Sequence, residues 1–151
     1  RHGQARRYHH VRVGVNSRLD TIQAAILLPK LEILNNEIEA RNTLSEHYIS
    51  GLKNVSSLKT PIIADDRTSA WAQFTIISDE REKIKEKLNN SGVPTAIHYP
   101  LPLNRQPAVL DETVSLPIGD ALANKVLSLP MHAYMRDDER QSVISAMVNG
   151  F

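Results

Sequence analysis

The stretch RHGQARRYHHVRVGVNSRLDTIQAAILL, residues 1–28, decides how the fold is inferred. Its first half is polar and carries several arginines together with His2, His9 and His10. Its second half is an apolar run at helical spacing. Loops that a scaffold element holds in place often carry the reactive groups of a protein. We therefore expect this junction between loop and helix to form part of an active site.

A long helix is predicted from the apolar half of this stretch. Asn16 or Asp20 can cap a helix that begins near Thr21, and isoleucines and leucines recur at helical spacing towards Leu52. Pro29 lies inside the pattern. Because proline lacks a backbone donor and clashes with the preceding turn, we expect a kink or a break at that position.

The remainder of the chain alternates between strand and helix signals. Strands are predicted at residues 70–77 and 95–100, and a short extended piece is predicted at residues 127–131. Helical patterns cover residues 79–92, 118–126 and 137–148, and a proline-rich loop covers residues 101–117. This order predicts an α/β fold, a small sandwich that follows a long helix.

Composition narrows the classes of protein that the chain can belong to. With 151 residues, 41% of them hydrophobic, one ordinary core is expected. The net charge of +1 gives no global attraction to nucleic acid or to anionic lipid. No apolar run approaches the roughly 20 residues of a membrane span, so no membrane partner is expected. The absence of cysteine fits a reducing cytoplasm.

The first residue is Arg1 rather than methionine. We therefore expect the chain to be the C-terminal portion of a longer protein.

Two groups of polar residues are candidates for ligand binding, and each has a structural alternative. His98 and Tyr99 end a predicted strand, where ligand groups are common, but Tyr99 can equally pack its ring while His98 bonds a backbone carbonyl. Asn16 and Arg18 precede a helix start, where free backbone donors and a guanidinium favour an anion. The alternative there is simple helix capping beside a surface arginine.

A metal site is not expected. No pair of histidines has the i, i+4 spacing with an acid that helical zinc sites use, and there is no thiolate ligand.

Several motifs, taken together and in order, resemble one protein family. They are RHGQ at 1–4, GVNSRLDTIQAAIL at 14–27, PTAIHYPLPL at 94–103 and VLSLPMH at 126–132. This pattern resembles the C-terminal part of the DegT/DnrJ/EryC1/StrS family of sugar aminotransferases. Within that family it is most similar to enzymes that aminate a 3-keto sugar in uronic acids derived from UDP-N-acetylglucosamine, for surface polysaccharides such as lipopolysaccharide O-antigen.

The resemblance implies a fold and an assembly. The family has the aspartate-aminotransferase fold, with a large domain, a small C-terminal domain and a cytoplasmic homodimer that shares its active sites across the interface. On this basis residues 1–20 end the active-site segment of the large domain, residues 21–54 form the connecting helix, and residues 55–151 form the small domain.

The resemblance also implies a reaction. Family members use pyridoxal phosphate to move an amino group from L-glutamate to a keto sugar nucleotide, and 2-oxoglutarate leaves. Asn16 matches the residue that a partner subunit offers to the cofactor phosphate. Arg18, His98 and Tyr99 match positions that hold the sugar nucleotide, including the carboxylate of a uronic acid.

No catalytic residue is assigned, because the Schiff-base lysine of the family is expected upstream of the RHGQ motif. The lysines of this chain do not match it; they are Lys30, Lys53, Lys59, Lys83, Lys85, Lys87 and Lys125.

Two other classes of function stay open on the sequence. One is a non-catalytic small domain that acts in dimerisation or ligand binding. The other is nucleic-acid binding by the basic residues 1–12, which the low aromatic content of 5% disfavours. If the helix at 19–34 exposes its apolar face, self-association through that face is expected.

Overall fold

The computed structural model describes residues 4–6, 9–10, 18–106 and 111–148. The chain divides into two compact units, residues 1–35 and residues 36–151. The first unit contains two short strands, β1 (Gln4–Arg6) and β2 (His9–His10), which pair antiparallel. It also contains the first part of the long helix α1 (Thr21–Leu52). This helix has the bounds that the sequence predicts.

Helix α1 begins with half of a capping box. The backbone N–H of Asp20 donates to Oε1 of Gln23 at 3.4 Å, so the third helical residue reaches back to the residue before the helix. A kink or a break was expected at Pro29; the helix continues through this residue, so the break is wrong, and the kink stays a prediction. Proline deprives the carbonyl of Ala25 of its partner. Both Ala25 and Pro29 are exposed, so water can satisfy that carbonyl.

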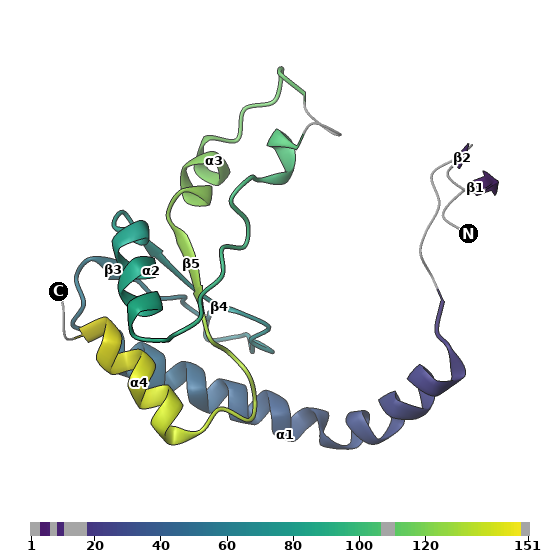
Figure 1. Cartoon of the computed structure of the whole chain (residues 1–151), viewed down its shortest axis with the longest axis horizontal. Helices are drawn as coiled ribbons and strands as arrows, with labels where there is room; N and C mark the ends of the chain where they lie inside the picture. The colour runs from purple at the N-terminus through teal and green to yellow at the C-terminus, as the bar shows by residue number, and fades with distance from the viewer. Residues whose placement is uncertain (1–3, 7–8, 11–17, 107–110, 149–151) are drawn as a thin grey trace. The chain divides into compact units, whose positions relative to one another are not determined.

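The second unit is built on a three-stranded antiparallel sheet in the order β3-β4-β5 (Figure 1). Its strands are β3 (Leu58–Lys59), β4 (Phe74–Ser78) and β5 (Val126–Leu129). Four further helical elements belong to this unit, namely α2 (Arg81–Asn90), the 3-10 turn η1 (Leu103–Arg105), α3 (Pro117–Ala123) and α4 (Asp137–Val148). Helix and sheet together confirm the predicted α/β class.

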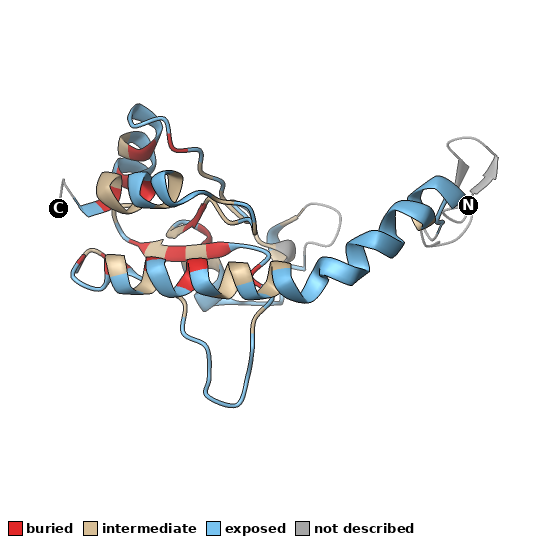
Figure 2. Ribbon diagram, turned by 90° about the horizontal axis from the view of Figure 1, so that it is seen from below, coloured by how far each residue is buried: buried red, intermediate tan, exposed pale blue. Residues whose placement is uncertain are grey.

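One face of the sheet is the apolar core. Strands β4 and β5 alternate, so that Phe74 lies opposite Leu129 and Ile76 lies opposite Leu127, all four buried. The last turns of α1 and the inner sides of α2 and α4 cover this face, as the buried positions in Figure 2 show. Within this core, the ring centroids of Tyr48 and Phe74 lie 5.0 Å apart. This single core is what the composition predicts.

The strands differ from the prediction at their ends. Strand β4 begins at Phe74 rather than at residue 70, because Trp71 has a φ of 46° and cannot belong to a regular strand. The indole N–H of Trp71 donates instead to Oδ1 of Asn42 at 3.0 Å. The short strand β3 was not predicted; it carries two residues and no clear alternation.

The predicted strand at 95–100 is wrong as a strand. Within it the structure contains one isolated antiparallel bridge, between Ala96 and Ser128. Pro94 and Pro100 flank this bridge, and since proline cannot donate a ladder hydrogen bond, pairing does not extend past them. The remaining helices, α2, α3 and α4, lie in the predicted regions, and α4 has the predicted bounds. The predicted end of α3 at residue 126 is wrong, because the helix ends at Ala123 and Val126 is the first residue of β5.

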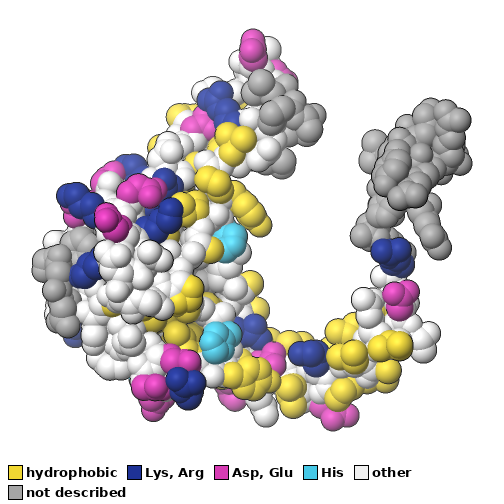
Figure 3. All heavy atoms as spheres, in the orientation of Figure 1, with side chains coloured by type: hydrophobic (Ala, Val, Ile, Leu, Met, Phe, Trp, Pro, Cys, Tyr) yellow, Lys and Arg dark blue, Asp and Glu magenta, His cyan; other side chains and the backbone are white. Residues whose placement is uncertain are grey.

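The first part of α1 carries a row of exposed apolar side chains, visible along the helix in Figure 3. They are Ile22, Ile26, Leu27, Leu28, Leu31, Ile33 and Leu34, and Leu19, two residues before the helix begins, is exposed as well. Self-association was expected if the apolar face of this helix is exposed, and these side chains are exposed. No helix in the described part of the chain is long and apolar enough to cross a membrane.

Candidate functional site

The candidate site lies on the face of the sheet opposite the apolar core. There Thr75 of β4 pairs with Ser128 of β5, and Ser128 pairs on its other side with Ala96. The Ala96–Ser128 bridge has both of its hydrogen bonds, at 3.2 and 2.7 Å. Two residues beyond Ala96 comes His98, so alternation places its side chain on the same face as Ser128.

A pocket of about 290 Å³ opens beside His98. Its lining residues come from the segment before β4, from residues 94–98, and from β5 and the residues that follow it. They are Ala72, Gln73, Pro94, Thr95, Ala96, His98, Ser128, Leu129, Pro130 and Met131. The pocket thus combines apolar walls with a few polar groups, the usual composition of a small-molecule site.

His98 is held through one ring nitrogen. Nδ1 lies 3.1 Å from Oγ of Ser128, and that oxygen lies 2.9 Å from Oγ1 of Thr75. Nε2 of His98 has no hydrogen-bond partner among the described residues. An imidazole that is anchored at Nδ1 can offer Nε2 to a ligand.

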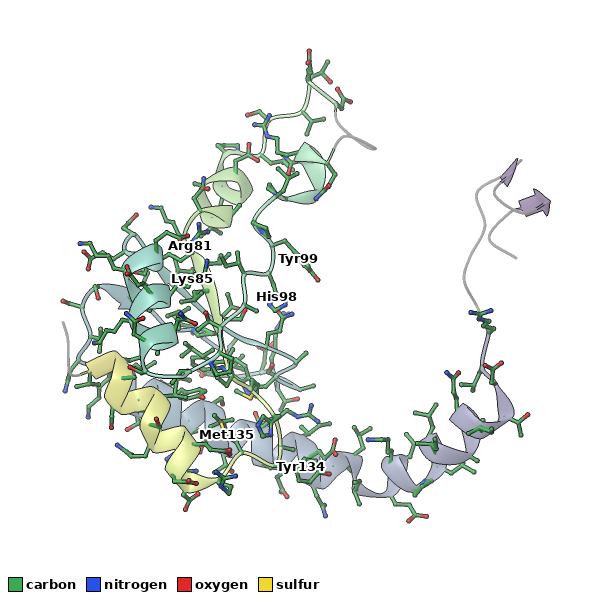
Figure 4. The ribbon with its side chains drawn as sticks, in the orientation of Figure 1. Arg81, Lys85, His98, Tyr99, Tyr134 and Met135 are labelled. Atoms are coloured by element: carbon green, nitrogen blue, oxygen red, sulfur yellow. The ribbon has the colours of Figure 1, made fainter. Side chains whose placement is uncertain are left out.

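Tyr99 lies beside His98 on the same segment, as Figure 4 shows. Its side chain is 69% exposed, and the two rings meet edge to face with centroids 5.5 Å apart. The alternative that Tyr99 packs its ring in the protein interior is therefore wrong. An exposed phenol next to a polar pocket can donate a hydrogen bond to a sugar or a phosphate.

The other two residues assigned by resemblance lie in the first unit. Arg18 is exposed and stands three residues before the first residue of α1, where its guanidinium can meet an anion. Asn16 lies outside the described residues. The structure places His98 beside a pocket with the exposed Tyr99 next to it, and the binding roles assigned to Asn16, Arg18, His98 and Tyr99 all remain predictions.

The sequence reasoning did not identify Ser128 and Thr75. Ser128 belongs to the VLSLPMH motif, but a serine in a strand usually faces solvent and carries no signal of its own. Here Ser128 is 5% exposed, because the 94–98 segment covers it. The pairing of β4 with β5 is the signal that could have found it, since this register puts Thr75 directly opposite.

Helix α1 supports the chain segment that leaves β5 next to the pocket. The buried hydroxyl of Tyr48 donates to the carbonyl of Pro130 at 2.9 Å. Burial raises the pKa of Tyr48 well above its ordinary value, so the hydroxyl stays a donor. Pro130 lines the pocket, and its position is thereby tied to the core.

The proline-rich segment after Tyr99 is held by an ion pair. Asp120 of α3 accepts from Nδ2 of Asn104 at 3.0 Å and from Nε of Arg105 at 3.1 Å. The hydrogen bond from Arg105 is the main reason why the pKa of Asp120 lies below its usual value. This contact fixes η1 against α3.

Pyridoxal phosphate needs a lysine amine for its Schiff base. Of the lysines in the described part of the chain, none lines the pocket at His98. Lys83, Lys85 and Lys125 each pair with a carboxylate, at 2.5, 3.7 and 2.5 Å. The described residues thus do not make a complete cofactor site. They also contain no group of three or more histidine or acidic side chains suited to a metal ion.

The chain is similar to several known sugar aminotransferases. It is 53% identical over 149 residues, 99% of its length, to the UDP-2-acetamido-2-deoxy-3-oxo-D-glucuronate aminotransferase of Pseudomonas aeruginosa, of which it spans 41%. Among solved structures, a DegT DnrJ EryC1 StrS aminotransferase from Brucella abortus matches with a TM-score of 0.82 at 38% identity, over 98% of this chain and 40% of that one. DesV of S. venezuelae, in complex with a ketimine intermediate, matches with a TM-score of 0.84 at 32% identity, over 98% and 41%.

The match to the family extends along nearly the whole chain. Residues 1–148 fit the family model described as the DegT/DnrJ/EryC1/StrS aminotransferase family, and the chain therefore belongs to that family.

Proposed function

We propose that this chain is the C-terminal portion of a pyridoxal-phosphate-dependent aminotransferase that moves an amino group from L-glutamate to a UDP-linked 3-keto uronic acid. The observation that carries the proposal is the 53% identity, over 149 residues, to a relative whose name specifies that substrate. The chain spans 41% of that relative, so the activity belongs to a longer protein that contains this chain.

The pocket at His98 is the proposed contact with the sugar nucleotide. Nε2 of His98 and the exposed hydroxyl of Tyr99 can meet the hydroxyl, carbonyl or phosphate oxygens of such a ligand. Arg18 is the proposed partner of the uronic carboxylate, because a guanidinium binds a carboxylate through two parallel hydrogen bonds. Each of these residues binds and orients, and none moves a proton in the proposal.

The cofactor is assigned to the whole protein rather than to the described residues. Pyridoxal phosphate, when bound, acts as the electron sink for amino transfer. Asn16 is the proposed contact to its phosphate, reached from the partner subunit of a homodimer. The Schiff-base lysine is proposed to lie upstream of the RHGQ motif.

The wider assignments follow the same family pattern. We propose that residues 1–20 end the active-site segment of the large domain and that residues 55–151 form the small domain. Residues 21–54 are proposed to form the helix that connects the two domains. The aminated sugar would serve the synthesis of a surface polysaccharide such as lipopolysaccharide O-antigen, and the enzyme would work in the cytoplasm.

The test of the function is a transamination assay on the complete protein with L-glutamate and a panel of keto sugar nucleotides. The proposal predicts release of 2-oxoglutarate with a UDP-3-keto uronic acid and much slower release with its neutral counterpart. Arg18→Ala should raise KM for the uronic acid by about tenfold or more, since a charge-assisted bond is lost. An unchanged KM would remove the uronic-acid preference from the account.

A second experiment tests the assignment of the lysine on this chain itself. The chain is mixed with pyridoxal phosphate, reduced with borohydride and mapped by mass spectrometry. Scattered, substoichiometric labelling agrees with a Schiff-base lysine outside the chain. A single stoichiometric adduct on one lysine would contradict that assignment.

A further inference from the structure

Trp71 has an unusual backbone conformation immediately before one wall of the pocket at His98. Its φ of 46° lies in the left-handed region, which a bulky side chain rarely adopts. The next two residues, Ala72 and Gln73, line the pocket. A strained conformation persists only where the surrounding structure holds it, and such conformations are frequent at functional sites. The contacts that hold Trp71 therefore also determine where this wall of the pocket lies.

Three contacts hold Trp71 in place. Its side chain is buried, and its ring centroid lies 5.5 Å from that of Phe74. Its indole N–H donates to Oδ1 of Asn42 at 3.0 Å. Its backbone N–H donates to Oγ of Ser69 at 3.2 Å. These contacts come from the core, from α1 and from the preceding loop, so three separate segments fix the conformation.

The hydrogen bonds of Asn42 determine which way its amide faces. Nδ2 donates to the carbonyls of Ile38 and Ser69, at 2.8 and 3.1 Å, while Oδ1 accepts from the indole. If the amide were reversed, Nδ2 would face the indole N–H and Oδ1 would face two carbonyl oxygens. The observed orientation is therefore the one that satisfies all three partners. Asn42 thus joins α1 to Ser69 and to Trp71 at once.

Gln73 lies on the pocket side of the sheet. Phe74 faces the core, so alternation along the chain places Gln73 on the opposite face, together with Thr75. Its place in the lining of the pocket agrees with this direction. The side chain is exposed, and its carboxamide can donate and accept hydrogen bonds at the same time. A sugar hydroxyl does the same, so the two groups are complementary.

We propose that Gln73 is a further ligand-binding residue of the pocket at His98, and that Asn42 is a positioning residue that holds it there through Trp71. The ligand group in view is a hydroxyl of the sugar, so this inference rests on the proposed function. Helix α1 then contributes to sugar binding from the core side of the sheet, without contact to the ligand.

The test is steady-state transamination by the complete protein, with L-glutamate and a UDP-3-keto uronic acid. Gln73→Ala should raise KM for the sugar nucleotide about threefold to tenfold, the loss expected for one hydrogen bond between neutral groups. The half-reaction with L-glutamate should keep its wild-type rate, because the sugar is absent from that step.

A double-mutant cycle separates the positioning role of Asn42 from a structural one. Asn42→Ala should raise the same KM in the wild-type protein, but less than about twofold further in Gln73→Ala, because its effect passes through Gln73. A general effect on the fold would appear in both backgrounds. Trp71→Phe keeps an aromatic ring beside Phe74 but lacks the indole donor, and it takes the place of Asn42→Ala in the cycle if that variant does not fold.

The matched control is Ser78→Ala at the other end of β4. It removes a buried hydroxyl that donates to the carbonyl of Ser57 at 2.7 Å. This variant should lower the stability of the protein and leave KM for the sugar nucleotide unchanged.

The outcomes distinguish this inference from the proposed function. If the wild-type protein transfers no amino group to any keto sugar nucleotide, the proposed function is wrong and the inference falls with it. If the wild-type protein is active, a wild-type KM in Gln73→Ala, or additive effects of Asn42→Ala and Gln73→Ala, would overturn the inference alone. A rise in KM with Ser78→Ala as large as that with Asn42→Ala would do the same, since it would indicate a general loosening of the sheet.

Discussion

The hydroxyl of Tyr134 donates a hydrogen bond to Glu37 at 2.6 Å, across 97 residues of sequence. Glu37 also accepts from Arg41 one turn later in α1, at 3.2 Å. Together with the bond from Tyr48 to Pro130, this contact ties the segment after β5 to α1 at two points. The wall of the pocket at His98 is therefore fixed by a helix that is distant in sequence.

Tyr134→Phe should loosen this segment without unfolding the protein. The hydrogen bond to Glu37 is the main cause of the raised pKa of Tyr134, so the bond favours the protonated phenol. Its contribution is complete below about pH 10 and is lost as the pH rises further. Amide hydrogen exchange should become faster at residues 131–136 in the variant. Tyr99→Phe, which alters a phenol of similar exposure at 69% against 68%, should leave that exchange unchanged.

Tyr48→Phe should lower the free energy of unfolding by about 1–2 kcal/mol, because the carbonyl of Pro130 loses its donor inside the protein. The variant should also change the alkaline limb of the stability curve. Burial raises the pKa of Tyr48, so folding favours its neutral form, and this contribution disappears as the pH rises above about 10. Urea titrations at several pH values should show a shallower decline for Tyr48→Phe. Parallel declines for the two proteins would show that Tyr48 does not govern the alkaline transition.

Two glycine-to-alanine changes in helices should have opposite effects. A Cβ on Gly51 of α1 would lie 2.8 Å from Cγ2 of Ile144 in α4, so Gly51→Ala should destabilise by roughly 1–2 kcal/mol after the gain in helix propensity. A Cβ on Gly119 of α3 meets nothing within 4 Å, so Gly119→Ala should stabilise by about 0.5–1 kcal/mol. Thermal unfolding of the two variants and of the wild-type protein measures both changes in stability. A stabilised Gly51→Ala would mean that α1 and α4 do not pack as closely as described.

The exposed apolar row on α1 should drive self-association of this chain. Leu28 and Leu31 are 66% and 63% exposed, and burying such surface contributes about 25 cal/mol per Å². Sedimentation at micromolar concentration should show dimers or larger species, and Leu28→Glu with Leu31→Glu should reduce them. Ile62→Glu changes an apolar side chain that is 92% exposed on a loop and serves as the control. A monomeric wild-type chain is the outcome that counts against the expectation.

The sequence predicts the helices of this fold well because their signals are local. The charge order of the 79–92 segment and the acids at the start of α4 lie within each helix, and Gly92 lies just past the end of α2. The fate of the 95–100 segment is decided elsewhere, by how far β5 can pair with it between Pro94 and Pro100. The continuity of α1 at Pro29 likewise depends on solvent access to one carbonyl rather than on propensity.

The residues of the candidate site also fall into two groups, those that the sequence identifies and those that only the structure reveals. His98 and Tyr99 stand out as residue types at the end of an extended segment, and the structure brings them together beside a pocket. Ser128 and Thr75 carry no such signal. Their role depends on the register between β4 and β5 and on the bridge to Ala96, which no local pattern encodes.

The most direct test of the account is steady-state transamination by the complete protein with His98→Ala and His98→Gln. With a UDP-3-keto uronic acid as acceptor, His98→Ala should raise KM for the sugar nucleotide about tenfold, while the half-reaction with L-glutamate keeps its wild-type rate. His98→Gln, whose amide can donate near the position of Nε2, should recover part of that loss. A wild-type KM in His98→Ala, or a wild-type protein that transfers no amino group to the sugar nucleotide, would contradict the account.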